Sequence, residues 1–521
     1  MARMVVIGGE VGGRGLFGGK RTPPEWAGLG VAVLVTVMVL LSAGPISVLS
    51  LLGAAAVLLA GVVLTTPNKF SGDRSLGALF VEARHRKHRR RKGTVNFTPV
   101  KDRPQTRRVK APKSRREEAD EHGMIDIPLR HRNNAPLMVG NVRHFVYASP
   151  EGPMVIFRHQ GKIKKPYYTV TLETLGTSSG IREEHREDAG HIAHGLMLSR
   201  LARRQHLVSH VQSLARAVPV DSADHLLWIH RRIPAGVPKV LLKSYGELCD
   251  LVQSRAEQHR SYETFRIPVS EKLSRKARAV GPGDLGYGKA IYQEVRSAMS
   301  QAEMMGSVQA FRPLGAENMA ALLRHLQDPG FDIDDTTGAD LMDCWQHLDG
   351  ASSPHSVIVN GSWHTRTGYV PATAFSPEAI PVQALKAVIS GIQPAVVHSV
   401  SVVIELQDAR AARGKARSHA AMDRARGKQV AKSGVVTDGS EEVLLNASHQ
   451  RLLDLKPGSG HHGAAYGLYI SYSVEHEDEI LGTADIIEAA AADAGIEQID
   501  WLDQRNDLAL ITTMPFTRGI R

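Results

Sequence analysis

The chain has 521 residues, and its apolar content of 42% excludes an intrinsically disordered chain, while its length predicts two to four folded units. Its two cysteines, Cys249 and Cys344, exclude a disulfide scaffold and favour a reducing compartment. The net charge of +11 is concentrated between Arg84 and Arg116, where fifteen Lys or Arg residues stand against one acid, so the rest of the chain is close to neutral.

The N-terminal region predicts a membrane anchor. Residues 1–25 hold seven glycines and are expected to be mobile. Residues 26–64 lack any charged side chain and form two apolar runs, Ala27–Ala43 and Ile46–Leu64, divided by a Gly-Pro turn. Because roughly 20 apolar residues cross a bilayer, we predict a transmembrane hairpin. A buried helical hairpin is the alternative, and the lack of a polar face in either run disfavours it. Basic flanks at both outer ends predict a two-span protein of the cytoplasmic membrane with both termini in the cytoplasm.

Residues 65–135 are predicted to be a basic cytosolic tether with extended or short helical pieces. Next to a membrane span, its densest block can contact anionic lipid headgroups, and the same charges can contact DNA phosphates. Lipid is favoured, because the block has no interleaved aromatic side chains for base stacking. The predicted lipid or nucleic-acid phosphate contacts are Arg84, Arg86, Lys87, Arg89, Arg90, Arg91 and Lys92.

Two successive α/β domains are predicted after the tether, over residues 136–335 and 336–521. Hydrophobic periodicity gives each the order strand, helix, long strand, long helix, strand, helix and strand. In the first domain, strands are expected at Tyr167–Leu175 and Leu207–Pro219. In the second, strands are expected at Val396–Leu406 and Leu508–Met514. The predicted fold class is therefore a membrane-anchored α+β protein, with the transmembrane hairpin followed by duplicated ferredoxin-like units.

No motif for catalysis, a cofactor or a metal emerges. Gly283–Ala290 has the glycine and lysine spacing of a phosphate-binding loop, but Ala290 replaces the hydroxyl that binds magnesium. The histidines on one predicted helix, His185, His191 and His194, lack the HExxH pattern, and two cysteines cannot form a zinc site. The sequence therefore predicts a non-enzymatic protein without cofactor or metal.

Several segments resemble a known family. They are Val211–Pro219, Ser244-Tyr245, Arg255–Tyr262, Trp363–Arg366, the 396–406 strand with its charged helix, and Pro515-Phe516-Thr517-Arg518-Gly519. In these the chain resembles actinobacterial membrane proteins associated with conjugation-type gene clusters. The C-terminal half also resembles the N-terminal, non-ATPase domain of conjugative type IV secretion ATPases, and the motor domain is expected to be a separate chain.

The resemblance implies a non-enzymatic inner-membrane structural subunit of a conjugation-like type IV secretion apparatus, which docks a separate motor ATPase. Expected partners are the motor, other channel subunits, anionic lipid and, indirectly, DNA, with an oligomeric state in the assembled machine. The alternative is the membrane-anchored E-type component of an ESX type VII secretion system, which also places a two-span hairpin ahead of a cytosolic domain.

Overall fold

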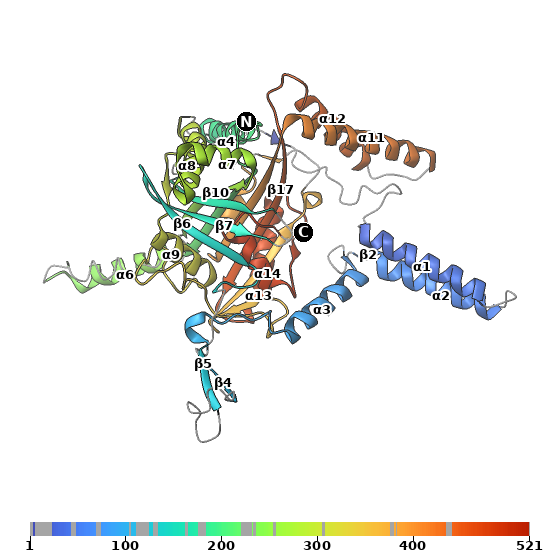
Figure 1. The fold of residues 1–521 in the computed structure, drawn as a ribbon, viewed down its shortest axis with the longest axis horizontal. Helices are drawn as coiled ribbons and strands as arrows, with labels where there is room; N and C mark the ends of the chain where they lie inside the picture. Colours follow the sequence, from blue (N-terminus) through green and yellow to red (C-terminus); the bar gives the residue numbers. More distant parts are fainter. Residues whose placement is uncertain are drawn as a thin grey trace.

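A computed structural model describes most of the chain (Figure 1). The described residues are 4–5, 23–42, 48–68, 74–103, 106–110, 124–128, 134–161, 165–175, 184–219, 232, 236–253, 257–304, 308–375, 380–381, 383–433 and 440–519. The predicted mobile segment 1–25 lies mostly outside these ranges. The body is a mixed α/β structure built on one large antiparallel sheet.

The predicted transmembrane hairpin is wrong. The apolar runs form helices α1 (Pro23–Ser42) and α2 (Val48–Thr65), which lie against each other so closely that a Cβ at Gly61 would lie 2.3 Å from that of Ala32. Within the described part of the chain, however, no helix has both the length and the apolar character needed to cross a membrane. The membrane-anchored fold class is therefore corrected to mixed α/β.

The central sheet has 12 strands, and its neighbours run in the order β12-β13-β14-β17-β16-β9-β10-β8-β7-β6, with β11 on β8 and β18 on β14. Continuous burial over residues 167–173 and 467–474 matches strands that are covered on both faces, whereas the alternating pattern over residues 141–149 matches a strand with one face towards solvent. The strands are β6 (Asn141–Ser149), β7 (Gly152–Gln160), β8 (Tyr167–Leu175), β9 (His210–Pro219), β10 (Glu257–Pro268), β11 (Ala310–Pro313), β12 (Leu348–Asp349), β13 (Val357–Val359), β14 (Trp363–Val370), β16 (Val397–Gln407), β17 (Gly463–Val474) and β18 (Asp500–Trp501).

The two halves of the sheet carry their strands in the same order. The first half runs β11-β8-β10-β9 and the second runs β18-β14-β17-β16, so each has the strand order of a ferredoxin-like unit. The halves meet where β9 pairs antiparallel with β16, with Arg216 opposite Ser399. Because this pairing makes one continuous sheet, the two predicted α/β domains share a single backbone framework.

Helices of both halves cover the first face of the sheet. In the first half, α4 (Glu184–Leu201), α7 (Glu271–Val280) and α8 (Gly283–Met304) pack on side chains such as Ile156 and Phe265. In the second half, α10 (Lys386–Ser390) and α13 (Glu479–Asp493) pack on Ile470 and its neighbours. Register places these residues on one side, because Val400 of β16 lies opposite Ala215 of β9.

The second face is covered by α9 (Ala316–Gln327) and by the C-terminal segment. The predicted strand Leu508–Met514 is wrong: this segment lies in α14 (Asn506–Ala509) and a 3-10 helix, Leu510–Thr513. A short apolar run is ambiguous between a buried strand and a buried helix. Gln212 of β9 holds the segment, since its amide donates to the Met514 carbonyl at 2.9 Å and accepts from Thr517 N at 2.6 Å.

Two helical insertions project from opposite sides of the sheet in Figure 1. Helix α6 (Lys239–Gln253) lies between β9 and β10, and the pair α11 (Ala409–Ser433) and α12 (Ser440–Asp454) lies between β16 and β17, the equivalent strands of the second half. The other elements are α3 (Leu76–Arg91) and the small strands β1 (Met4–Val5), β15 (Ile380–Pro381), β2 (Pro67–Asn68), β3 (Arg74–Ser75), β4 (Thr106–Lys110) and β5 (Met124–Pro128).

Candidate functional site

The predicted phosphate-contact block forms the C-terminal half of helix α3, and Lys92 is its C-cap residue. Ser75 caps the helix, because its hydroxyl oxygen accepts a hydrogen bond from Ala78 N at 3.2 Å. Basic residues fill the last turn, where they complement the partial negative charge of a helix C-terminus. The block was expected in extended or short helical pieces of a tether. It belongs instead to a continuous helix of 16 residues.

One face of α3 is attached to the sheet body through Arg86. Its Nη2 atom donates to three backbone carbonyls in one loop, those of Ser353 at 2.6 Å, Gly350 at 3.1 Å and Ala351 at 3.3 Å. Burial, followed by the like charge of Arg90, lowers the pKa of Arg86. The Arg86 guanidinium therefore binds backbone carbonyls of the protein itself.

Arg89 and Glu82 lie on the same face and make the second attachment. Arg89 pairs with the carboxylate of Asp507 and donates to the Gln504 carbonyl at 3.4 Å, and Arg505 pairs with Glu82 at 3.0 Å. The spacing of residues 82, 86 and 89 puts them on one helix face. Burial raises the pKa of Asp507, and Arg89 opposes that effect. We call these contacts of Glu82, Arg86 and Arg89 the α3 clamp.

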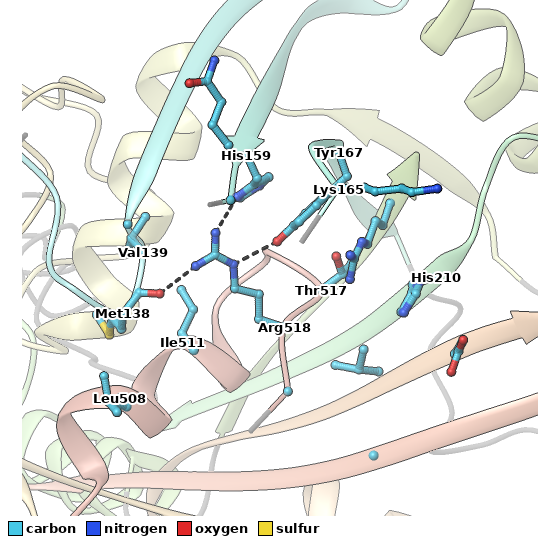
Figure 2. Close-up of a pocket in the computed structure, with 18 of the residues that line it drawn as sticks. Met138, Val139, His159, Lys165, Tyr167, His210, Leu508, Ile511, Thr517 and Arg518 are labelled. Atoms are coloured by element: carbon cyan, nitrogen blue, oxygen red, sulfur yellow. Dashed lines mark hydrogen bonds between the residues drawn. The ribbon is translucent and has the colours of Figure 1, made fainter. Parts of the chain in front are cut away.

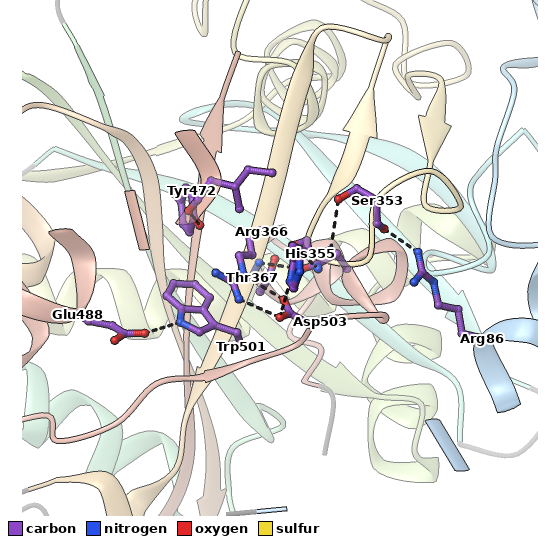
Figure 3. A network of polar contacts seen from close by, with 11 residues as sticks. Arg86, Ser353, His355, Arg366, Thr367, Tyr472, Glu488, Trp501 and Asp503 are labelled. Carbon is purple, nitrogen blue, oxygen red and sulfur yellow. Dashed lines mark hydrogen bonds and ion pairs between the residues drawn. The ribbon is translucent and has the colours of Figure 1, made fainter. Parts of the chain in front are cut away.

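The α3 clamp continues into a polar network that reaches β14 and β18 (Figure 3). The loop that receives Arg86 also carries His355, whose Nδ1 lies 2.9 Å from the Asp503 carboxylate. Arg366 of β14 donates to both oxygens of Asp503, at 3.0 and 2.8 Å, and its guanidinium lies 4.7 Å from the Trp501 ring centroid. Helix α3 is thus connected to the edge of the second half-sheet by hydrogen bonds and ion pairs.

The opposite face of α3 is exposed and basic. Arg84, Lys87 and Arg91 are exposed at a spacing of three and four residues, which places them on one side, away from the clamp. Arg90 and Lys92 are exposed as well. We call Arg84, Lys87 and Arg91 the outer basic row. Of the seven predicted phosphate contacts, five are therefore accessible to a partner, while Arg86 and Arg89 serve inside the molecule.

The glycine-lysine motif around Lys289 is helical. Gly283–Met304 is helix α8, so Gly286, Gly288 and Lys289 do not form a phosphate-binding loop. The glycines serve packing instead: a Cβ at Gly288 would lie 2.6 Å from the Tyr147 ring, and one at Gly286 would lie 2.1 Å from the Gly281 carbonyl. The close approach of Gly286 to Gly281 belongs to the tight corner between α7 and α8.

The histidines singled out in the sequence lie on α4, where the Nε2 atom of His194 is 3.4 Å from the Glu263 carboxylate. Among the residues that the structure describes, no group of three or more His, Cys, Asp or Glu side chains is arranged to hold a metal ion.

The sequence pattern missed the residues that receive α3. Ser353 and Asp507 lie 267 and 418 residues from their arginine partners. The helical spacing of Glu82, Arg86 and Arg89 could have indicated that this face of α3 contacts the body, because it carries both signs of charge. The outer basic row on the other face carries positive charge.

No model of a known protein family matches the chain, and no curated protein is significantly similar to it.

Proposed function

We propose that this protein is a non-enzymatic structural subunit of a conjugation-like type IV secretion apparatus, which docks a separate motor ATPase. The resemblance of its C-terminal half to the non-motor domain of the secretion ATPases supports this assignment. A body of two half-sheets with the same strand order gives a rigid platform for such docking.

The observation that carries the proposal is the division of α3 into two faces. Arg86 and Arg89 fix the helix to the body, so the outer basic row of Arg84, Lys87 and Arg91 is held in a set orientation. A cationic row on a fixed helix favours contact with a phosphate-bearing surface, because the side chains need little ordering of the backbone on binding. Anionic lipid headgroups are the first proposed partner of this row, and DNA is the second.

A transfer assay in a host that carries the native gene cluster tests the proposal. Deletion of the gene should abolish DNA transfer, and the wild-type gene should restore it. The triple variant Arg84→Gln, Lys87→Gln, Arg91→Gln should restore transfer poorly. A matched triple variant on α11, with Arg410, Lys415 and Arg417 changed to Gln, removes the same charge from an exposed helix and should restore transfer normally.

Biochemical measurements on the full-length chain complete the test. The motor ATPase of the cluster should copurify with the tagged protein, and the purified protein should not hydrolyse nucleotides. Normal transfer in the deletion strain, or hydrolysis that survives purification, would refute the assignment. Binding of the outer basic row to anionic vesicles and to single-stranded DNA, each over a range of salt concentrations, separates the two partners.

A further inference from the structure

A cavity of about 770 Å³ opens on the second face of the sheet, where the C-terminal segment crosses it. Its floor is the ends of β8, β9, β10, β16 and β17, and its rim includes residues 137–141 and 517–519 (Figure 2). The Pro515–Gly519 motif noted in the sequence therefore forms part of a cavity wall, a role that is independent of α3.

Arg518 is a fixed cation in this wall. Its guanidinium donates to the Met138 carbonyl at 2.7 Å, to the Tyr167 hydroxyl at 2.9 Å and to Nδ1 of His159 at 3.0 Å (Figure 2). Since Nδ1 accepts, the His159 proton resides on Nε2, which lies 2.8 Å from the Thr169 hydroxyl. Burial, with the charges of Arg518 and Arg266, holds the pKa of His159 well below its usual value. The imidazole is therefore neutral, so it does not offset the positive charge of Arg518.

Arg266 is the second cation, and it is incompletely satisfied. Its guanidinium carbon lies 3.8 Å from the centroid of the Tyr167 ring, and its Nε atom is buried without a hydrogen-bond partner in the described part of the chain. An unpaired buried donor lowers the stability of the protein, and the loss is greater when the donor is charged. Burial and the like charge of Arg518 lower the pKa of Arg266. Two guanidiniums thus line one cavity, and the Nε atom of one of them has no acceptor.

The remaining charges leave the cavity positive. Lys165 lies on the rim and is exposed, and Glu405 at the end of β16 is the acid of the lining. Lys165, Arg266 and Arg518 together outweigh Glu405. An anion between the two guanidiniums would reduce their mutual repulsion.

We propose that this cavity binds an organic phosphate of about the size of a nucleoside monophosphate, with Arg266 as the principal phosphate ligand. Arginine suits phosphate because its planar donors match the tetrahedral oxygens. The volume lies in the range of pockets that enclose small organic ligands and is much larger than a single inorganic ion requires. Apolar walls from Leu137, Val139 and Ile511 suit the organic part of such a ligand. The proposal stands apart from the function proposed above.

Calorimetric titration of the full-length protein tests it with three probes: AMP, glycerophosphate and inorganic phosphate. AMP should bind more tightly than inorganic phosphate. Glycerophosphate stands for a lipid headgroup, so binding as tight as that of AMP would retain the phosphate site and assign a headgroup source. The variant Arg266→Gln should weaken binding about tenfold or more, because a charged hydrogen bond is lost. The variant Glu405→Gln should tighten binding, since it removes a negative charge from the lining.

Arg158→Gln is the matched control. Arg158 precedes His159 in β7, also stacks on a tyrosine, Tyr168, and also has a buried Nε without a partner, but it belongs to the opposite face of the sheet. It should bind AMP as the unchanged protein does. Thermal unfolding of each variant excludes misfolding, and the opposite sign expected for Glu405→Gln gives a second criterion. If none of the three probes binds at millimolar concentration, if Arg266→Gln binds unchanged, or if inorganic phosphate binds as tightly as both organic probes, the proposal is wrong.

Discussion

Arg216 of the central strand β9 donates from Nε to Nε2 of His325 on α9, across 3.3 Å in the interior of the protein. The arginine is only 2% exposed, and its Nη1 donates to the Ser399 hydroxyl at 3.1 Å. His325 Nδ1 lies 2.7 Å from the Phe331 carbonyl and donates to it. Because Nε2 accepts, the imidazole is neutral. A single pair thus joins the strand at the centre of the sheet to the helix on its second face.

This pair predicts an acid-sensitive term in stability. Burial, together with the charge of Arg216, lowers the pKa of His325 to about 3. Below pH 6.5 the unfolded chain therefore binds a proton that the folded protein rejects, so folding stability falls as the pH falls. Between pH 7.5 and 5.5 the loss from this residue should be about 1.4 kcal/mol. Urea unfolding of the wild type and of His325→Gln at both pH values measures the difference.

The control for this experiment is the same exchange at His347, which is exposed. The wild type and His347→Gln should lose equal stability over this pH interval, while His325→Gln should lose about 1.4 kcal/mol less. Equal losses in all three proteins would contradict the assignment.

Asp507→Asn should release α3 from the body. The buried carboxylate of Asp507 is the ion-pair partner of Arg89, and its loss removes a charged contact worth about 1.5–3 kcal/mol. Amide hydrogen exchange of residues 76–91 should become at least about tenfold faster. Arg84→Gln, on the outer basic row, should leave the exchange unchanged. Identical protection in Asp507→Asn and the wild type would show that the α3 clamp does not hold the helix.

Glu173→Gln should strongly destabilise the first half-sheet. Glu173 is 2% exposed and accepts from Arg260 at 3.0 Å and from Arg312 at 2.7 Å. Loss of the buried charge leaves two guanidiniums together, which should cost about 3 kcal/mol in urea unfolding. Asp334→Asn removes the exposed partner of Arg260 and should cost less than about 1 kcal/mol. Similar costs for the two variants would mean that burial does not decide the effect.

Two helical glycines should respond to alanine with opposite signs. A Cβ at Gly288 would lie 2.6 Å from the Tyr147 ring, so Gly288→Ala should destabilise the protein by about 1–3 kcal/mol through overpacking. A Cβ at Gly195 on α4 would meet no atom within 4 Å, so Gly195→Ala should stabilise it by about 0.5–1 kcal/mol. Thermal unfolding of both variants decides the matter, and a gain in stability at Gly288 would contradict the packing described.

Local pattern located several elements well and failed at others for identifiable reasons. The strand predicted at Tyr167–Leu175 is confirmed. It was predictable because polar and apolar residues alternate along it and a glycine-serine stretch follows it. The strand predicted at Leu508–Met514 is wrong, because a buried apolar run has no periodicity to separate strand from helix. A different limit applies to α1 and α2, which are helices as predicted, but whose apolar composition wrongly indicated membrane spans.

The candidate sites depended on contacts that no local pattern encodes. The block at Arg84–Lys92 was found from charge density, but its division into an inner and an outer face depends on Asp507 and Ser353, far along the chain. The cavity was not predicted, because Arg266 and Arg518 come together only when the C-terminal segment crosses the sheet. Because these two residues are far apart in the sequence, no local pattern shows that their positive charges lie in one cavity.

The crossing of the C-terminal segment has a consequence for biosynthesis. Phe516 packs against Phe157 with ring centroids 5.3 Å apart, and Arg518 contacts His159, which lies 359 residues earlier in the sequence. Ribosomes add about 5–20 residues per second, so tens of seconds pass between the synthesis of β7 and that of the C-terminal segment that packs on it. During that interval the part of the second face that the C-terminal segment later covers is open to water and to other nascent chains. We expect the unfinished chain to engage chaperones until the residues around Phe516 emerge from the ribosome.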